Sequence, residues 1–218
     1  MRLSEETRRP SPNDSTVSAI MEYLVQQRLS PLPWTSATSE LRARISFLRR
    51  EIGEPWPDWS DKTLIATSEE WLRPYLAGMT SIGDIKDLNL GMLLRSQLPW
   101  PEGGQIDDLV PNTLELASGR SLAIDYASAV KEGTAPVVRV RVQDLFGTKT
   151  HPTVAGGRVP LVLHLLSPAD RPIQVTADLP GFWSGSWIDV KKDIAGRYPK
   201  HQWPDDPANA DPKRMKDR

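Results

Sequence analysis

The sequence predicts an α+β protein, in which an N-terminal helical subdomain precedes a small five-stranded, OB-like β-barrel or sheet and a C-terminal helix. In the first half, apolar residues recur at the spacing of amphipathic helices. From Pro111 onward the apolar period changes to two, which is typical of half-buried strands. Near the end, Ser186–Gly196 returns to the helical period, with Trp187, Val190 and Ile194 on one side.

These changes of period divide the chain into four predicted segments. Residues 1–14 are polar, contain two prolines and are interpreted as a disordered leader. The helical subdomain is predicted over residues 15–110 and the β-rich domain over residues 111–207. Residues 208–218 have few apolar residues and are interpreted as a disordered tail.

Five helices are expected in the first half, because capping residues and prolines delimit them. The first two run from Asp14 or Ser15 to about Leu29, and from an N-cap at Thr35 to about Ile52. A short third helix begins with a cap at Ser60 or Asp61, and the fourth extends from Ser68 to Leu76. The fifth begins at Ser81–Asp84 and is ended by Pro99. Leu41, Ile45 and Leu48 form the apolar stripe of the second helix.

The segment EPWPDWSD, residues 54–61, is dense in proline and tryptophan. Two interpretations are open. It is a packed corner between helices, or it lines a groove in which a peptide or a base stacks.

Five short strands are expected in the second half. Two of them, Thr113–Ala117 and Leu122–Tyr126, form a hairpin across Ser118-Gly119, a favourable tight-turn pair. The other three are Val138–Val142, Val159–Leu166 and Ile173–Ala177. Because Val159–Leu166 is apolar throughout, it is expected to be buried on both faces. A partly open barrel and a sheet packed under helices both fit this pattern.

The segment after the last helix, RYPKHQWPDDP, carries Tyr198 and Trp203 and is too apolar to be free. We expect it to fold back onto the barrel.

Composition excludes several classes of protein. The net charge of −1 excludes a globally basic nucleic-acid binder, although residues 111–218 hold 15 basic against 12 acidic residues and would favour a polyanion. Without cysteine the chain forms no disulfide or thiolate metal site, and a cytoplasmic location is expected. No apolar run reaches the roughly 18 residues of a membrane helix, and the N-terminus lacks a signal-peptide core, so no membrane insertion is expected.

No residue pattern indicates catalysis. A phosphate-binding GxxxxGK[ST] loop and an acidic box for magnesium are both missing from the sequence. His151, His164 and His201 lack the spacing of metal ligands, and His164 is expected to be a hydrogen-bonded core residue. Gly156-Gly157-Arg158 forms either a turn or an anion-binding nest. The chain by itself is predicted not to be an enzyme and to hold no cofactor or metal.

The most promising binding residues combine positive charge with aromatic rings, the combination that single-strand binding surfaces use. The candidate nucleic-acid-binding residues are Arg139, Arg141, Arg158, Arg171, Lys191, Lys192, Arg197, Lys200, Trp183 and Trp203. Arg139 and Arg141 share a strand face. In the alternative interpretation, the aromatic rings belong to the core and the cations are merely solvated.

Several ordered segments between Leu32 and Pro207 resemble the C-terminal region of HrpB-type bacterial ATP-dependent helicases, relatives of the DEAH-box RNA helicases. The segments are LPW (32–34), WPDWSD (56–61), EEWLRPYLAG (69–78), VQDLFG (142–147), VAGGRVPLVLHLLSPADRPIQVT (154–176), LPGFW (179–183) and GRYPKHQWPDDP (196–207). One departure is Val110-Pro111-Asn112-Thr113, where the family is expected to have Ala-Pro-Thr-His.

The resemblance implies that ATP and magnesium are bound by two RecA-like motor lobes that this sequence does not match. The chain would then be an accessory domain whose partners are the motor domains and RNA or single-stranded DNA. A protein-interaction module that docks the helicase to another cellular partner is the alternative. The sequence leaves both open.

Overall fold

The computed structural model describes residues 14–211, which fold into two compact units. In the sequence, the first unit ends at Gly103 and the second begins at Gly104, whereas the change of apolar period lies at residues 110 and 111. Of the predicted leader, residues 1–14, only Asp14 lies within the described residues, and of the predicted tail only residues 208–211 do.

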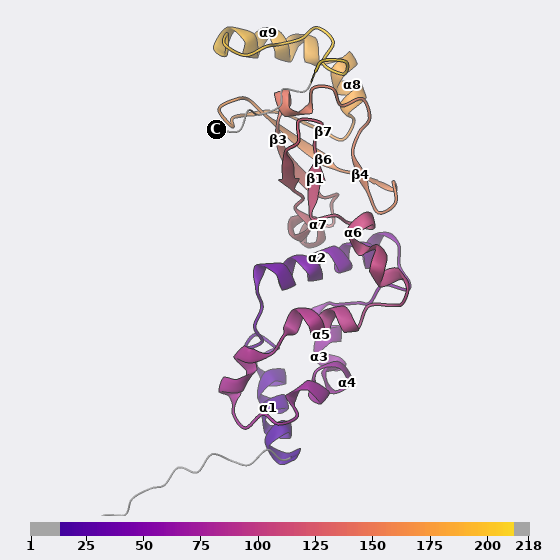
Figure 1. The fold of residues 1–218 in the computed structure, drawn as a ribbon, viewed down its shortest axis with the longest axis vertical. Coiled ribbons are helices and arrows are strands. Elements are labelled where there is room, and N and C mark those ends of the chain that lie inside the picture. The colour runs from indigo at the N-terminus through magenta and orange to yellow at the C-terminus, as the bar shows by residue number, and fades with distance from the viewer. Residues whose placement is uncertain (1–13, 212–218) are drawn as a thin grey trace, which may run out of the picture. The chain divides into compact units, whose positions relative to one another are not determined.

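The first unit consists of short helices (Figure 1). They are α1 (Asp14–Gln26), α2 (Ser36–Glu51), α3 (Asp61–Ala66), α4 (Ser68–Trp71), the 3₁₀ helices η1 (Arg73–Leu76) and η2 (Ile82–Asp87), and α5 (Leu90–Ser96). A further 3₁₀ turn, η3 (Glu102–Gln105), spans the boundary between the units.

The limits of α2 agree with the predicted ones because local capping fixes them. The Thr35 hydroxyl accepts a hydrogen bond from the Thr38 backbone N–H, and the Thr38 hydroxyl in turn accepts one from the Thr35 N–H. This reciprocal pair satisfies two N–H groups that would otherwise lack an acceptor at the start of the helix. At the other end, Ile52 is the C-cap. The predicted N-cap of α3, Ser60, is also confirmed.

Three other helices are shorter than predicted. α1 ends at Gln26 rather than near Leu29, because Arg28 and Leu29 have left-handed φ values of 52° and 60°. The predicted Ser68–Leu76 helix becomes α4 and η1 around Pro74, whose ring cannot continue the α-helical hydrogen bonding. Instead of one helix after Ser81, η2 is followed by α5, which Asn89 caps separately.

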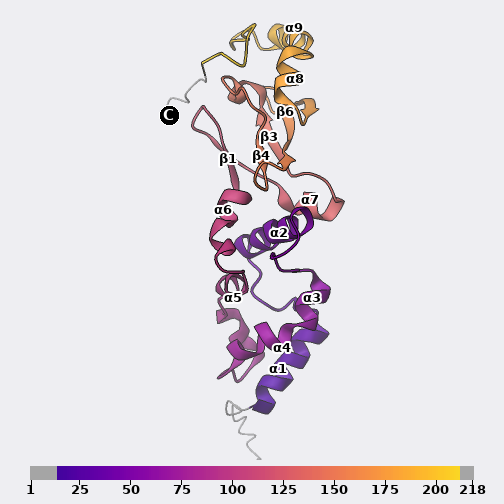
Figure 2. The same ribbon diagram turned by 90° about the vertical axis from the view of Figure 1, so that its right-hand side faces the viewer.

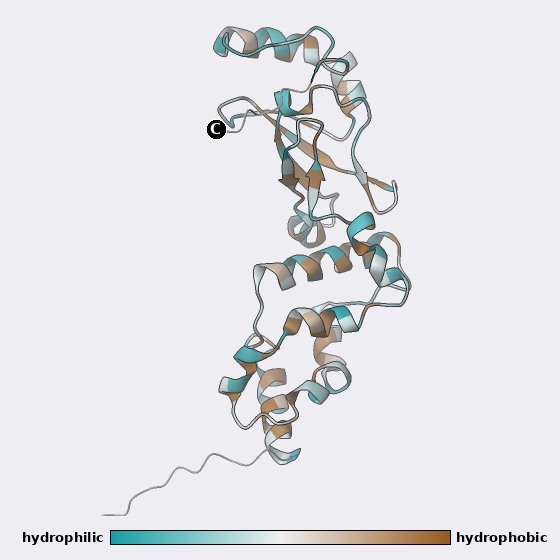
Figure 3. Cartoon of the chain, viewed as in Figure 1, coloured by the Kyte–Doolittle hydropathy of each residue, from teal (hydrophilic) through white to brown (hydrophobic). Residues whose placement is uncertain are grey.

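The core of the first unit lies where these helices meet. α2 packs against α5, and its predicted stripe, Leu41, Ile45 and Leu48, is at most 3% exposed. Hydrophobic and hydrophilic residues alternate around α2 accordingly (Figure 3). The side chains that are 0% exposed in this unit are Leu24, Ile45, Phe47, Leu48, Leu72, Leu76 and Leu94.

The second unit contains three small sheets and no closed barrel within the described residues, so the predicted five-stranded barrel is not present there. Two sheets have two strands each: β1 (Thr113–Glu115) with β2 (Ser121–Ala123), and β4 (Thr153–Val154) with β5 (Val159–Pro160). The third sheet contains β3 (Val137–Arg141), β6 (Val162–Leu166) and β7 (Pro172–Thr176), with β6 in the middle. The helical elements are α6 (Ile106–Leu109), α7 (Tyr126–Glu132), η4 (Val142–Leu145), α8 (Leu179–Ser184) and α9 (Trp187–Arg197).

Two features explain why no barrel forms. The β1–β2 hairpin exists as predicted, with Leu114 opposite Leu122, but its return strand stops at Ala123. Asp125 then accepts a hydrogen bond from the Ser128 N–H at 2.9 Å and starts α7, so the strand predicted through Tyr126 becomes a helix. β6 also pairs in parallel with β3 and antiparallel with β7, which gives a mixed sheet.

The predicted burial of Val159–Leu166 on both faces is wrong. The segment is interrupted at Leu161, and only alternate residues of β6 are fully buried. Leu163 and Leu165 are 0% exposed, whereas Val162, His164 and Leu166 are half-buried on the opposite face. Because only one face of the β3-β6-β7 sheet carries the core, the apolar run does not indicate two-sided burial.

An aromatic cluster completes the core of the second unit. α8 leads directly into α9, and the two helices contact each other (Figure 2). The rings of Phe146, Phe182, Trp183, Trp187 and Trp203 are linked by centroid distances of 5.0–6.4 Å. The prediction that the C-terminal segment folds back is confirmed, because Pro204 O accepts from the Trp187 indole and Pro207 O accepts from the Gly147 N–H.

Trp187 lies at the centre of this cluster and is 1% exposed. We predict that Trp187→Ala lowers the free energy of unfolding by about 3–5 kcal/mol, since it removes a buried aromatic and leaves a cavity. Urea denaturation followed by circular dichroism measures this loss. Ile188→Ala is the matched control, because Ile188 is 57% exposed and its truncation should change stability by about 0.5 kcal/mol or less. Equal losses in the two variants would contradict the assignment of Trp187 to the core.

Candidate functional site

Four of the eight predicted cations form ion pairs with carboxylates of the same unit. The pair with two hydrogen bonds is Arg141 with Asp170, in which Arg141 Nε and Nη2 each lie 2.7 Å from a different carboxylate oxygen. The other three are Lys191 with Asp205, Lys192 with Asp189 and Arg197 with Asp193. A cation held in this way offers less of its charge to a phosphate than a solvated one does.

The Arg141–Asp170 pair affects the pKa of both groups. The hydrogen bonds from Arg141 lower the pKa of Asp170, and the same bonds raise the pKa of Arg141. Both groups are therefore charged at neutral pH, and the guanidinium is held in a two-pronged geometry that a phosphate would have to displace.

The remaining four cations are Arg139, Arg158, Arg171 and Lys200, all exposed and without an ion pair among residues 14–211. They lie on different elements: Arg139 on β3, Arg158 in the β4–β5 turn, Arg171 before β7 and Lys200 in the C-terminal segment. Gly156 and Gly157 have φ values of 66° and 85°, and they form the turn between β4 and β5. The cations thus do not form one continuous strip along a single element.

The two candidate tryptophans have different environments. Trp183 is 7% exposed, donates its indole N–H to Thr148 O at 3.0 Å and packs against Phe146, Phe182 and Trp187. The structure therefore places it in the core rather than on a stacking surface. Trp203 is only half-buried, so part of its ring stays accessible.

Trp203 lines a groove of about 460 Å³ together with Phe146, His201, Gln202 and Gln143. The His201 and Trp203 ring centroids lie 6.0 Å apart. The side-chain oxygen of Gln143, Oε1, is buried and has no hydrogen-bond partner among the described residues. The groove therefore combines aromatic surface with an unsatisfied acceptor.

Sequence reasoning missed Gln143 and His201 as groove residues. Gln143 lies in η4, two residues after the end of β3. His201 comes near it only because the C-terminal segment folds back, which leaves 3.4 Å between Gln143 Nε2 and His201 Nδ1. The spacing of hydrophobic residues does not predict a contact between two residues as far apart in the sequence as Gln143 and His201.

The other two histidines have structural positions. His151 contacts Leu161 O through Nε2 and accepts the Leu179 N–H at Nδ1, so it joins the residue between β5 and β6 to the start of α8. His164 is half-buried on the face of the sheet away from Leu163 and Leu165, rather than in the predicted core position. Within residues 14–211, no group of three His, Cys, Asp or Glu side chains could hold a metal ion. None of the helices described there is long and apolar enough to cross a membrane.

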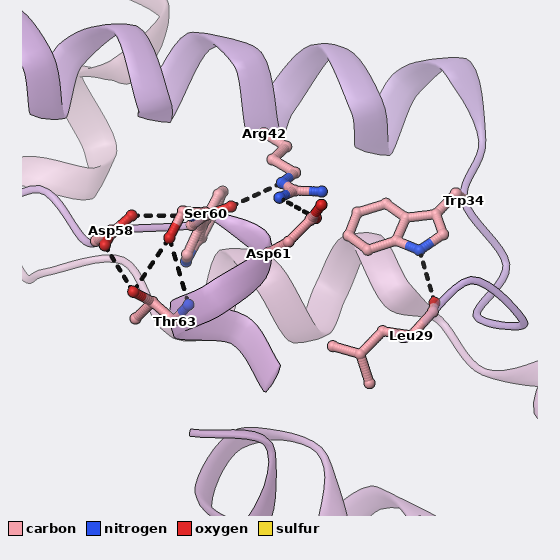
Figure 4. A network of polar contacts seen from close by, with 8 residues as sticks. Leu29, Trp34, Arg42, Asp58, Ser60, Asp61 and Thr63 are labelled. Carbon is pink, nitrogen blue, oxygen red and sulfur yellow. Dashed lines mark hydrogen bonds and ion pairs between the residues drawn. The ribbon is translucent and has the colours of Figure 1, made fainter. Parts of the chain in front are cut away.

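In the first unit, a polar network holds the proline- and tryptophan-rich turn against α2 (Figure 4). Arg42 donates to Trp59 O and to the Asp61 carboxylate, both at 2.7 Å. The Arg42 guanidinium also lies over the Trp34 ring, 5.3 Å from its centroid, and the Trp34 indole donates to Leu29 O. Arg42 thereby fixes the turn to α2, and through Trp34 it connects the segment that follows α1 to the same helix.

Asp58 holds the turn at its other side. Its carboxylate accepts from the Thr63 hydroxyl at 2.6 Å and from the Ser60 N–H at 2.9 Å (Figure 4). The hydrogen bond from Thr63, followed by that from Ser60, lowers the pKa of Asp58 below 3.8. The folded state therefore favours ionised Asp58.

Comparison with known proteins gives the family of the chain. The family described as ATP-dependent helicase C-terminal, HrpB_C, matches residues 71–207, more than half of the sequence. The chain belongs to this family.

Relatives agree with this membership of the helicase C-terminal family. The chain is 41% identical over 202 residues to the ATP-dependent RNA helicase HrpB of Escherichia coli strain K12, an alignment that covers 92% of the chain and 24% of that protein. It is also similar to the crystal structure of the E. coli DExH-box NTPase HrpB, with a TM-score of 0.85 and 40% identity over 95% of the chain and 25% of the other. A second structure, described as the E. coli DEAH/RHA helicase HrpB, gives a TM-score of 0.72 and 36% identity over 93% and 25%. The chain thus spans about a quarter of these relatives.

The hydrogen bonds of Asp58 give this helicase C-terminal chain a predicted pH dependence. Because the pKa of Asp58 is lowered on folding, its contribution to stability is present above about pH 3.8 and is lost as the pH falls through the folded-state pKa. We predict that Asp58→Ala costs about 0.5–1 kcal/mol at neutral pH, a value reduced by solvent screening, and less in acid.

Urea denaturation at neutral pH and at about pH 2.5 tests this, with Asp58→Asn as the control that keeps an acceptor oxygen but cannot titrate. A cost of Asp58→Ala that is the same at both pH values would mean that the charge of Asp58 contributes nothing.

Proposed function

We propose that the chain is the accessory C-terminal region of an HrpB-type ATP-dependent helicase and that its second unit binds unpaired RNA bases. Family membership supports the helicase context, and the relative from E. coli is named an ATP-dependent RNA helicase. In this proposal, motor domains outside the chain bind ATP and magnesium in the cytoplasm, and the chain itself hydrolyses nothing.

The observation that carries the RNA proposal is the groove beside Trp203. Its lining offers the ring faces of Trp203 and His201 and the unpartnered Oε1 of Gln143. A base that stacks on Trp203 could donate an amino hydrogen to Gln143 Oε1, which satisfies that buried acceptor. Stacking on an aromatic ring contributes about 1–3 kcal/mol per base and tolerates any sequence.

The charge of the lining favours a base over a phosphate. Asp211 also lines the groove, and no lysine or arginine does so among the described residues. A carboxylate repels a phosphate but leaves a neutral base unaffected. Backbone phosphates would therefore lie outside the groove, near exposed cations such as Lys200, which immediately precedes His201.

The electrostatic part of this binding must be small. The positive charge of residues 111–218 depends on Lys213, Arg214, Lys216 and Arg218, because residues 111–207 hold 11 basic and 10 acidic residues. Together with the four ion pairs described above, this predicts weak binding that depends on stacking as much as on charge.

We predict that Trp203→Ala weakens the binding of labelled single-stranded RNA by about tenfold, the loss expected for one stacked base. Fluorescence anisotropy measures the affinity, and circular dichroism checks the fold, since the Trp203 indole also donates to Tyr198 O. Trp100→Ala is the control, because Trp100 is 91% exposed.

Gln143→Leu keeps the Trp203 ring in place and should weaken binding several-fold. Unchanged affinity in folded Trp203→Ala and Gln143→Leu variants would rule out this groove as the RNA site.

A second prediction concerns salt. If the four candidate cations without an ion pair among residues 14–211 each contact one phosphate and release about 0.7 counterions, the slope of log affinity against log salt should be about −3. Arg139→Ala should reduce the slope by about 0.7, whereas Arg141→Ala should change it less because Asp170 already binds that guanidinium. Titrations at a series of salt concentrations separate the two. An equal or larger effect of Arg141→Ala would show that the ion pair opens on binding.

A further inference from the structure

A second groove lies entirely within the first unit. It has a volume of about 510 Å³ and is formed by the proline- and tryptophan-rich turn, α3, α4, η1 and the end of α5. Its lining includes Pro57, Asp58, Trp59, Glu70, Trp71, Pro74, Tyr75 and Gln97.

Two hydrogen-bond donors of this groove are unsatisfied. Trp59 Nε1 and Gln97 Nε2 are both buried and have no partner among residues 14–211. Trp59 is 1% exposed, so water cannot readily satisfy its N–H. Leaving a buried donor unpaired is costly in a folded protein. Two such donors lining one groove therefore point to a ligand that carries acceptors.

The other tryptophans show which acceptor an indole takes in this protein. Five buried or half-buried indoles, from both units, donate to main-chain carbonyl oxygens at 2.9–3.0 Å. The pairs are Trp34 with Leu29, Trp71 with Leu64, Trp183 with Thr148, Trp187 with Pro204 and Trp203 with Tyr198. A peptide carbonyl in the groove would give Trp59 the same arrangement.

The walls of the groove fit an extended, proline-containing peptide. Pro57, Pro74, Trp71 and Tyr75 provide rigid apolar and aromatic surface, and Tyr75 is 41% exposed. Such surfaces bind the polyproline II conformation, whose carbonyls point outward and are free of internal hydrogen bonds. The polar network of Arg42 and Asp58 fixes one wall (Figure 4), so the groove is preformed.

The charges specify a basic ligand. Asp58 and Glu70 line the groove, and none of its described lining residues is a lysine or arginine. The lowered pKa of Asp58 keeps its carboxylate ionised, and the Glu70 side chain, which also lines the groove, is exposed. A lysine or arginine next to the prolines would complement both carboxylates.

We propose that this groove binds a partner protein through an extended, proline-containing segment with an adjacent basic residue, whose main-chain carbonyls accept hydrogen bonds from Trp59 Nε1 and Gln97 Nε2. The proposal is independent of RNA binding, because the two grooves belong to different units.

The full chain is titrated into a short labelled peptide of alternating proline and alanine with an arginine at each end, and fluorescence anisotropy measures binding. In parallel, NMR follows the indole N–H resonances. Binding should move the Trp59 indole resonance downfield while the Trp203 resonance stays in place. No binding, or binding that leaves the Trp59 resonance unmoved, would overturn the proposal.

Two variants test the donors and the charge. Gln97→Leu removes one donor at similar size and should weaken peptide binding by about tenfold. Glu70→Gln should weaken it several-fold and lower its salt dependence, whereas Glu40→Gln, an exposed carboxylate on α2 outside the groove, should leave it unchanged. Equal peptide affinity in the wild type, Gln97→Leu and Glu70→Gln would overturn the proposal. Trp203→Ala should not affect the peptide, which separates this result from the RNA proposal.

The chain itself contains a segment of the same chemistry, Arg8-Arg9-Pro10-Ser11-Pro12. The double variant Arg8→Glu and Arg9→Glu of the full chain tests whether this segment competes with the labelled peptide for the groove. Unchanged peptide affinity in this variant supports a partner protein as the occupant. A severalfold gain in affinity would overturn that assignment and identify the chain's own segment as the occupant.

Discussion

The fold depends on hydrogen bonds from tryptophan indoles to main-chain carbonyls. The sheets of residues 14–211 have only two or three strands, and 20 prolines remove backbone donors from the chain, so regular secondary structure can fix only part of it. Long irregular segments are held instead by large buried rings whose N–H groups bind loop carbonyls. Trp34 holds the segment after α1 and Trp187 holds the C-terminal segment in this way. Each such contact joins apolar burial to a directional bond, which fixes position as well as contributing stability.

Both proposed binding sites are departures from this pattern. Trp203 has its N–H satisfied but part of its ring uncovered, whereas Trp59 has its ring covered but its N–H unsatisfied. The first offers a stacking face and the second a donor, so the two grooves suit different ligands. The nearby charges agree with this difference, since exposed Lys200 precedes the first groove in sequence and Asp58 and Glu70 line the second.

Local signals predicted the helices better than the sheets. Thr35 and Ser60 specify helix starts through their own hydroxyls, and Pro74 limits a helix through its own ring, so a short stretch of sequence carries the information. The cap at Asp125 is a local signal, because its carboxylate accepts from the Ser128 N–H three residues on, but the alternating pattern around it was interpreted as a strand. The barrel was predicted from the number of strands, but strand pairing is non-local, and the parallel pairing of β3 with β6 has no local signature. The same limit applies to the site. The cations were visible in the sequence, whereas their neutralisation by Asp170, Asp193 and Asp205, and the burial of Trp183, required the structure.

The return of the C-terminal segment also sets an order of assembly. Trp187 and Gly147 find their acceptors on Pro204 and Pro207, which leave the ribosome after every other residue of the aromatic cluster. Until Pro204 and Pro207 emerge, the Trp187 indole and the Gly147 N–H lack the acceptors that they have in the folded chain. A chain cut before Pro204 would leave both donors without these acceptors, and cellular proteases would cleave it more readily than a chain that carries the segment.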